Sequence, residues 1–277
     1  MPLSALLAFA IGALPPALPY DAVLPRQTNA VPEKCLSRFL EYPPGPGKLG
    51  FPRCLWENPF PRNPDFWLKN VDFSCASPWN DAHGPLRAGT AISKRHIVYA
   101  KHFPLALGTR IAFVGVNGDV SHYALRAARG VDGTDIMVGL LDYELTPDVH
   151  PAKVLPSGFE KRLVEGSKWP VVTFNRREQA YLSEITVVRA DSRPAHVRLV
   201  NGKASNPAWR TLGGNLVGGD SGNPAFLLYQ GHPILVYCVY YGEEGRGPPI
   251  HEYLRAIQQA MDELCPGYRL EPFAFTP

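Results

Sequence analysis

The sequence predicts an all-β protein that ends in one helix, and three features support this fold class. The 277 residues include 29 prolines and 25 glycines, a content that favours short strands joined by turns over long helices. From about residue 85, short apolar or alternating runs lie between turn residues, with a spacing that suits a closed or sandwiched antiparallel sheet. Helical periodicity is convincing only near the C-terminus.

The first 22 residues differ from the rest of the chain. Their apolar stretch, LSALLAFAIGAL, is too short to span a bilayer comfortably and is typical of the apolar region of a secretory signal. No positive charge precedes it, so a short buried or frayed apolar end is the alternative. We expect residues 1–22 to act as a signal peptide, the protein to be secreted or extracytoplasmic, and its mature form to have no membrane partner.

The composition of residues 23–80 predicts a proline-rich N-terminal arm. From Pro15 to Pro64 inclusive there are twelve prolines, and a helix or a strand ladder cannot persist at that density, because proline lacks a backbone N–H. A disordered linker is the alternative, although Trp56 and Trp67 argue against it. Whether the arm is a propeptide or a cover over the sheets stays open.

Strand-like runs rich in Val, Ile, Tyr and Phe follow within residues 81–277. In order they are AGTAIS, HIVYA, TRIAFVGV, SHYALRAA, DIMVGLL, WPVVTF, AYLSEITVV, AHVRLV, AFLLY and ILVYCVYY. The period then changes in EYLRAIQQAMDEL, whose apolar side chains form one stripe at helical spacing: Leu254, Ile257, Ala260, Met261 and Leu264. This stripe predicts a helix near residues 251–264 that ends at Pro266-Gly267.

Five cysteines are present, so at least one is unpaired within the monomer. Cys238 lies in ILVYCVYY, which is typical of a buried strand, and we expect it to be an inert, unpaired core thiol. The other four could form two disulfides in an exported protein, in any of three pairings; they are Cys35, Cys54, Cys75 and Cys265. No Cys/His spacing indicates zinc, and we expect neither a metal nor a cofactor. The net charge of +3 is too small to predict a nucleic-acid partner.

The segment GGDSGNPAF at residues 218–226 raises a question of chemistry. Gly, Asp, Ser, Asn and Pro are turn residues, and a plain tight turn is the simplest interpretation. To act as a nucleophile, Ser221 needs a nearby base, a group that orients this base, and donors for a developing oxyanion. The rest of the chain therefore decides between a turn and a catalytic turn.

Among the eight histidines, His102 has the most distinctive setting. In GTAISKRHIVYAKHF, a strand-like run passes through a polar turn into HIVYA, and Lys101-His102 follows at once. The end of a strand is a place where the fold can aim a catalytic base. Any single histidine is more often a surface residue or one with its hydrogen bonds satisfied, so this setting alone assigns no role.

Three segments resemble motifs of the chymotrypsin/trypsin-like serine proteases, in that family's order. Ala100-Lys101-His102-Phe103 corresponds to Ala-Ala-His-Cys, and GTDIMVGLL is similar to the Asp-Ile-x-Leu-Leu strand, which puts Asp135 in the role of the acid. GGDSGNP resembles Gly-Asp-Ser-Gly-Gly-Pro. Asp132 and Asp142 are the alternatives for the acid. The resemblance covers about residues 85–265 and does not include the arm.

The resemblance implies that residues 81–277 form a trypsin-like domain of two six-stranded antiparallel β-barrels with a C-terminal helix. It also implies a serine endopeptidase that hydrolyses peptide bonds of a protein or peptide substrate through an acyl-enzyme. Ser221 would attack the scissile carbonyl, His102 would take and return its proton, and Asp135 would fix the imidazole tautomer. The N–H groups of Gly219 and Ser221 would hold the oxyanion.

The chain departs from the family at the expected substrate pocket. Asn215 stands six residues before Ser221, where trypsins carry an acid, so cleavage after Lys or Arg loses its main support. Tyr240, Tyr241 and Gly242 replace Ser-Trp-Gly in the segment that would pair with substrate as an added strand. Tyr241 keeps the aromatic wall and Gly242 the pocket mouth, whereas Tyr240 loses a small hydroxyl. The alternative is that both tyrosines simply pack in a strand.

Further departures concern activation and the serine turn. No Ile-Val-Gly-Gly precedes AGTAIS, so the family's activation, in which a new N-terminus pairs with Asp220, has no visible source. Phe103 stands where the family has a cysteine, and no cysteine lies across from it at Arg87 or Ala88. Asn223 replaces the second glycine after the serine, and we expect it to reshape the turn slightly without touching the nucleophile.

Two other functions are alternatives to the protease. An α/β-hydrolase would need Gly-x-Ser-x-Gly, a catalytic acid and histidine after the serine, and strands alternating with helices. The second residue after Ser221 is Asn223, the candidate acid and histidine precede the serine, and the strand-like runs do not alternate with helices. A catalytically inactive protease-fold binding module stays open, because Tyr240 and the missing activation sequence depart from active members. The sequence makes no prediction about the oligomeric state.

Overall fold

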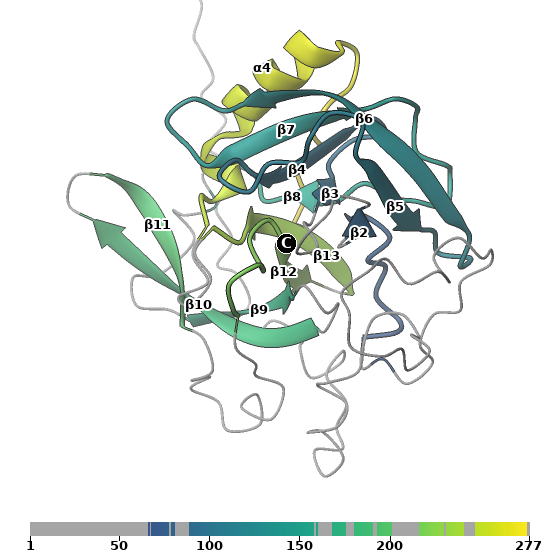
Figure 1. The fold of residues 1–277 in the computed structure, drawn as a ribbon. Helices are drawn as coiled ribbons and strands as arrows, with labels where there is room; N and C mark the ends of the chain where they lie inside the picture. Colours follow the sequence, from purple (N-terminus) through teal and green to yellow (C-terminus); the bar gives the residue numbers. More distant parts are fainter. Residues whose placement is uncertain are drawn as a thin grey trace, which may run out of the picture.

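The computed structural model describes residues 66, 68–77, 79–80, 89–157, 159, 168–175, 180–190, 193–200, 216–229, 231–240 and 247–275, and the statements below concern this part of the chain. Two β-sheets make up most of it, and one α-helix follows them near the C-terminus. In Figure 1 the first sheet and the helix form the upper half of the molecule, and the second sheet lies below them.

The first sheet has seven antiparallel strands: β1 (Ala76–Ser77), β2 (Trp79–Asn80), β3 (Gly89–Ala91), β4 (His96–Ala100), β5 (Arg110–Val114), β6 (Val120–Gly130) and β7 (Ile136–Leu141). Their spatial order is β1-β3-β4-β7-β6-β5-β2. The two edge strands, β1 and β2, are separated by one residue in the chain, so the edges meet and the sheet is a nearly closed barrel. The Ser77 hydroxyl donates a hydrogen bond to the Ala112 carbonyl of β5 across this closure.

The second sheet has six strands: β8 (Lys153–Val154), β9 (Lys168–Phe174), β10 (Ala180–Ala190), β11 (Arg193–Val200), β12 (Pro224–Tyr229) and β13 (His232–Cys238). Their order is β11-β10-β9-β12-β13-β8, and β8 runs parallel to β13 while the other pairs are antiparallel. The hairpin of β10 and β11 extends away from the other strands in Figure 1. The two edges do not pair with one another among the described strands, so the expected second six-stranded barrel is not shown.

Strand β12 is buried along its whole length because it lies between two hydrophobic cores. Phe226 and Leu228 belong to a core that includes side chains of both sheets, whereas Ala225, Leu227 and Tyr229 belong to a smaller core on the other face. Successive side chains of a strand point to opposite faces, so every residue of PAFLLY is buried. This explains why the strand reads as a continuous apolar run rather than an alternating one.

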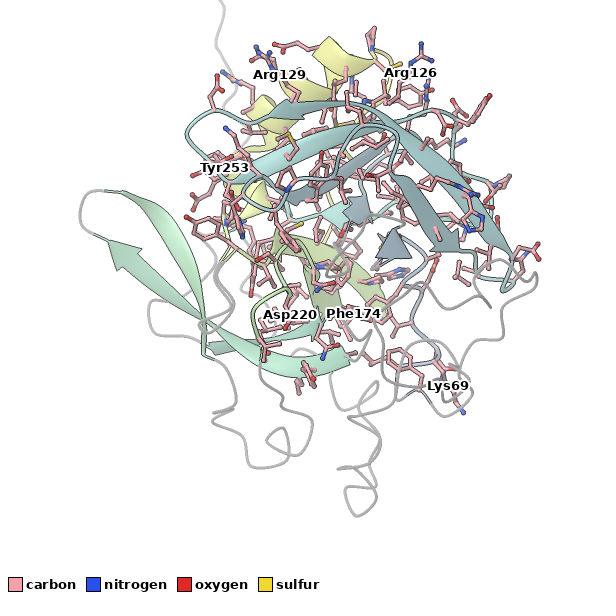
Figure 2. The ribbon with its side chains drawn as sticks, in the orientation of Figure 1. Lys69, Arg126, Arg129, Phe174, Asp220 and Tyr253 are labelled. Carbon is pink, nitrogen blue, oxygen red and sulfur yellow. The ribbon has the colours of Figure 1, made fainter. Side chains whose placement is uncertain are left out.

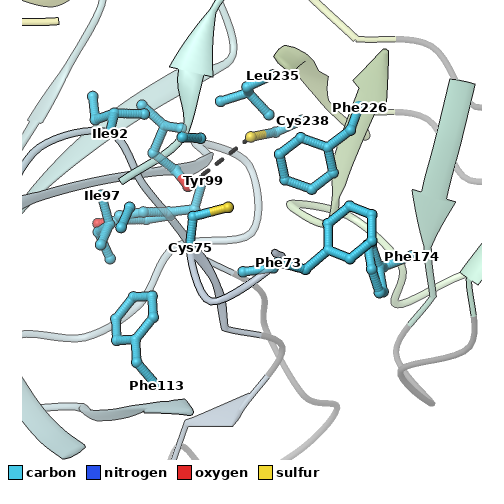
Figure 3. Packing of buried hydrophobic residues seen from close by; sticks show 14 of the residues in the cluster. Phe73, Cys75, Ile92, Ile97, Tyr99, Phe113, Phe174, Phe226, Leu235 and Cys238 are labelled. Atoms are coloured by element: carbon cyan, nitrogen blue, oxygen red, sulfur yellow. Dashed lines mark hydrogen bonds between the residues drawn. The ribbon is translucent and has the colours of Figure 1, made fainter. Parts of the chain in front are cut away.

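Three aromatic rings pack the segment that precedes β1 against the second sheet. The ring of Phe73 lies 5.0 Å from that of Phe174 and 5.4 Å from that of Phe226, measured between centroids. Figure 3 shows these rings packed beside Cys75 and Cys238. Phe73 belongs to the last part of the segment expected to be the arm, residues 23–80, and Phe66 and Leu68 of that segment are also buried in the larger core.

The predicted C-terminal helix is confirmed as α4 (Leu254–Leu264). It begins three residues after the expected start at residue 251, because Ile250–Glu252 form a separate 3-10 turn. Ile257, Ala260 and Met261 are buried, and the helix packs against β6 and β7. The apolar stripe seen in the sequence is therefore the face that covers the first sheet.

The described cysteines are free thiols: Cys75, Cys238 and Cys265. For Cys238 this confirms the expected unpaired thiol, and burial raises its pKa to about 12. Burial also raises the pKa of the Cys75 thiol. Cys75 and Cys265 therefore form no disulfide in this structure; Cys35 and Cys54 lie outside the described residues, and a disulfide between them stays a prediction.

The expected signal peptide, residues 1–22, and most of the arm also lie outside the described residues. Within the part of the chain that is described, no helix is long and apolar enough to cross a membrane.

Candidate active site

The pairing of β4 with β7 brings His102 and Asp135 together. The two strands are antiparallel, with Ala100 opposite Ile136, so the end of β4 meets the beginning of β7. The N–H of Lys101 extends this pairing by donating to the carbonyl of Asp135 over 2.7 Å. His102 therefore follows one strand and Asp135 precedes its neighbour at the same edge of the first sheet.

Asp135 contacts His102 through both carboxylate oxygens. Oδ1 accepts the backbone N–H of His102 at 2.8 Å, and Oδ2 lies 2.7 Å from Nδ1 of the imidazole. An ionised carboxylate can only accept, so Nδ1 carries a proton and Nε2 of the neutral ring is left as an acceptor. Nε2 lies 2.9 Å from Oγ of Ser221. The side chain of Asp135 is 14% exposed and that of His102 is 41% exposed, so the imidazole faces solvent while the carboxylate is largely covered.

Ser221 lies just after the junction of two consecutive β-turns. The N–H of Asp220 donates to the carbonyl of Val217 at 3.1 Å, and the N–H of Asn223 donates to the carbonyl of Asp220 at 3.1 Å. The Asp220 carboxylate also accepts the N–H of Val217 at 2.7 Å, which closes the first turn a second time.

Two glycines give these turns their shape. Gly219 has φ 96° and Gly222 has φ 90°, and each is the third residue of its turn, where type II turns require a positive φ. Among the described residues, neither the N–H of Gly219 nor that of Ser221 donates a hydrogen bond. Two available donors beside a serine hydroxyl are what an oxyanion site needs.

The serine turn is held to the second sheet by buried groups. Asp220 is fully buried, and Figure 2 shows it in the half of the molecule formed by the second sheet, away from α4. The N–H of Gly222 donates to the carbonyl of Val239, and the N–H of Val239 donates to the carbonyl of Asn223, each at 2.8 Å. The turn is thus tied to the residue that follows β13.

Two aromatic rings flank the imidazole of His102. Phe103 is roughly parallel to it, with centroids 6.4 Å apart, and Tyr240 is nearly perpendicular at 5.4 Å. Tyr240 lies beyond the end of β13 and is 44% exposed, so it does not simply pack within a strand. Val217, at the start of the serine turn, is also partly exposed.

The three carboxylates considered for the acid have different surroundings. Asp135 alone among them contacts His102 within the described residues, whereas Asp142 accepts the N–H groups of Ala124 and Tyr143 at 2.9 and 3.0 Å. Asp132 lies in the exposed turn before β7. The structure therefore brings together His102, Asp135 and Ser221.

Other expected site residues have different outcomes. Asn215, Tyr241 and Gly242 lie outside the described residues, so their roles in a substrate pocket stay predictions. In the described ranges, no group of three or more His, Cys, Asp or Glu side chains is placed to hold a metal ion. Sequence reasoning missed the side chain of Asn223, which donates a hydrogen bond from Nδ2 to the Asp220 carbonyl at 3.1 Å. The only signal for it was the departure from glycine at this position.

Comparison with known proteins adds no relative to this description. The sequence matches no family model, and a comparison with curated proteins also gives no match. Any assignment of function therefore depends on the geometry of the site.

Proposed function

We propose that this protein is a serine endopeptidase that hydrolyses peptide bonds in a protein or peptide substrate. One observation carries the proposal: a continuous chain of hydrogen-bonding distances runs from Asp135 through His102 to Ser221, at 2.7 and 2.9 Å. These three side chains come from two different sheets, and each is the residue type that its role requires. The glycine-shaped turn beside the hydroxyl supports the same function.

The chemistry follows from which atom can accept a proton. Ser221 Oγ forms a bond to the scissile carbonyl carbon while its proton passes to His102 Nε2, and the carbonyl oxygen becomes an oxyanion near the N–H groups of Gly219 and Ser221. The imidazolium then gives that proton to the leaving amine as the C–N bond breaks, which leaves an acyl-serine. Water attacks the acyl group with His102 again as the base, and the carboxylic acid product leaves with Ser221 restored.

Asp135 stays ionised throughout this cycle. Its carboxylate holds the tautomer in which Nδ1 carries a proton, and it stabilises the positive charge that forms on the ring when Nε2 accepts the serine proton. It does not take a proton itself.

The proposal includes a chymotrypsin-like arrangement of two antiparallel barrels, with seven strands in the first sheet instead of the expected six. Its support is the nearly closed first sheet, the largely antiparallel second sheet, and the position of the three side chains where the sheets meet. It also includes secretion, with residues 1–22 as the signal peptide, for which the apolar N-terminal stretch is the support.

The decisive experiment combines covalent labelling with turnover. We expect a fluorophosphonate probe to label Ser221 in the wild-type protein and to leave Ser221→Ala unlabelled. Turnover of a peptide substrate should fall on the order of a million-fold in Ser221→Ala or His102→Ala and little further in the double variant, because the groups act as one unit. A Ser121→Ala variant is the control, since the Ser121 hydroxyl contacts Thr146 and not the site.

The outcomes separate the two functions that the sequence left open. Labelling and turnover that both require Ser221 support the endopeptidase. A folded wild-type protein without labelling or turnover supports a catalytically inactive binding module on the same fold. Single losses that multiply in the double variant would show that His102 and Ser221 do not act together.

A further inference from the structure

The side chain of Asn223 contacts the backbone of the serine turn. It is 1% exposed, and its Nδ2 donates to the carbonyl oxygen of Asp220 at 3.1 Å. The backbone N–H of Asn223 donates to the same oxygen, also at 3.1 Å. The orientation of the amide follows from chemistry, because a carbonyl oxygen can only accept and the amide nitrogen must therefore face it. One residue thus holds a single carbonyl with two donors.

The held carbonyl shares a peptide unit with the N–H of Ser221. A trans peptide is planar, and its C=O and N–H point in opposite directions. When the Asp220 carbonyl is held toward Asn223, the Ser221 N–H must point out of the turn. One hydrogen bond leaves the peptide plane free to rock about that contact, whereas two donors from one rigidly placed residue restrict this motion. Asn223, two residues later in the chain, therefore orients the Ser221 N–H, which is the donor that would bind the oxyanion.

The other end of the Asn223 amide argues for positioning rather than stabilisation. Its Oδ1 is buried and has no hydrogen-bond partner among the described residues. A buried acceptor without a partner lowers the stability of the fold. The Asn223 side chain therefore holds the turn through Nδ2 while its Oδ1 reduces stability. Unpaired groups of this kind call for a reason other than stability.

We propose that Asn223 is a positioning residue of the oxyanion site, which orients the Ser221 N–H by holding the Asp220 carbonyl. This inference rests on the proposed endopeptidase function and gives it a further residue. It extends the expectation that Asn223 reshapes the turn slightly without touching the nucleophile. Asn223 touches neither the nucleophile nor the base among the described contacts, and it acts through the peptide plane alone.

The test compares two variants with a matched control. Asn223→Ala removes the amide, and Asn223→Asp keeps its shape but replaces the donor with an acceptor that repels the Asp220 carbonyl. Gln258→Ala is the control, because Gln258 also donates from an amide to a backbone carbonyl, that of Tyr268 at 2.9 Å, but on α4. Each protein is assayed for kcat, KM, thermal stability and inhibitor binding.

Two peptide inhibitors separate the oxyanion from the rest of the substrate. A trifluoromethyl ketone forms a tetrahedral adduct with Ser221 that carries an oxyanion, and the corresponding alcohol binds without one. We expect Asn223→Ala to lower kcat and the affinity for the ketone about tenfold, less than the loss of a whole oxyanion donor. KM and the affinity for the alcohol should stay within about twofold of wild type. Gln258→Ala should lower stability and leave these ratios unchanged.

Two kinetic results would overturn the positioning role. One is a kcat and a ketone affinity within about twofold of wild type in both Asn223 variants. The other is equal weakening for the ketone and the alcohol, which would mark a general structural effect.

A measurement without substrate separates this inference from the proposed function. The amide signal of Ser221 in a ¹⁵N–¹H NMR spectrum should move or broaden in both Asn223 variants and stay fixed in Gln258→Ala. If the wild-type protein shows no labelling and no turnover, the endopeptidase proposal fails, while a moved Ser221 signal still supports the orientation of this peptide by Asn223. An unmoved Ser221 signal overturns the inference whatever the activity.

Discussion

Each carboxylate oxygen of Asp135 accepts a hydrogen bond from a different N–H group of His102. This arrangement predicts the effect of replacing one carboxylate oxygen with an NH₂ group. In Asp135→Asn, the amide oxygen must face the backbone N–H, which cannot give up its hydrogen, so the NH₂ group faces Nδ1. The imidazole then carries its proton on Nε2 and cannot accept the proton of Ser221. We expect kcat to fall roughly ten-thousand-fold, as measured by steady-state turnover.

Asp142→Asn is the matched control for that substitution. Asp142 closes the same strand but accepts backbone N–H groups of Ala124 and Tyr143. We expect its turnover to stay within a few-fold of wild type once folding is equal. A comparable fall in both variants would mean that the loss at Asp135 reflects damage to β7 rather than the wrong tautomer.

His96 predicts a pH-dependent stability. Ser93 Oγ accepts the N–H groups of Arg95 and His96, so its own proton goes to His96 Nδ1 at 2.9 Å, which favours the neutral ring. Burial, and then the charge of Arg95, lower the pKa of His96 to about 4 from the ordinary 6.5. The unfolded chain binds this proton more readily than the folded chain. The contribution of His96 to the free energy of unfolding is therefore fully present above pH ~6.5 and is lost as the pH drops toward ~4.

The expected loss at His96 is at most about 3 kcal/mol between those pH values. Urea unfolding at a series of pH values measures it, and His96→Gln should flatten this part of the curve. An unchanged slope in the variant would show that other groups, the carboxylates above all, account for the pH dependence.

At the scale of the element, Gly139 shows how tightly β7 packs between its neighbours. A Cβ at this position would lie 2.6 Å from Leu125 Cδ1 and 3.0 Å from Ile97 Cγ1. We expect Gly139→Ala to lower the free energy of unfolding by about 1–3 kcal/mol through overpacking. Gly89→Ala on β3 is the control, because the nearest atom to its Cβ would be the terminal Cδ1 of Ile97 at 3.2 Å, and the next, Ile97 Cβ, lies at 4.0 Å. Chemical denaturation of both variants decides this, and equal stabilities would contradict the argument.

The elements that the sequence predicted best are those whose burial requires a recognisable pattern of apolar residues. The runs HIVYA and PAFLLY are buried at every position, and α4 carries one apolar stripe. The length and composition of these segments were therefore enough to predict two strands and a helix. The strands β1, β2 and β8 have two residues each, which is too short to show a period of two. Their pairing depends on residues far away in the chain, and the parallel direction of β8 follows from tertiary contacts.

The site divides in the same way between local and distant causes. His102, Asp135 and Ser221 each stand in a local motif that the sequence displays, and the resemblance to a known family gave their order. The second hydrogen bond from Asn223 and the contact of Tyr240 with His102 depend on turn geometry and on the meeting of two sheets. The spacing of residues along the chain does not predict such contacts.

At the scale of the whole molecule, the shared core predicts that both sheets unfold together. The larger core contains Phe73, side chains of the first sheet, and Phe174 and Phe226 of the second. We expect Phe73→Ala to lower the free energy of unfolding by about 3–5 kcal/mol, and the loss of peptide hydrolysis to coincide with the loss of near-ultraviolet circular dichroism. Tyr143→Ala is the control, because this ring is 72% exposed. Two separate transitions would contradict a single cooperative unit.

The ties between the serine turn and Val239 have a consequence for the newborn chain. His102 and Asp135 emerge from the ribosome long before Ser221, and the turn that presents Ser221 receives its two 2.8 Å hydrogen bonds only when Val239 has followed. If the proposed endopeptidase function holds, the nascent polypeptide has until then an acid and a base without an oriented hydroxyl, and it has no complete catalytic site. Chains stalled with residue 239 still inside the ribosome, and chains stalled after it has emerged, can be exposed to a fluorophosphonate. We expect labelling of the second set alone.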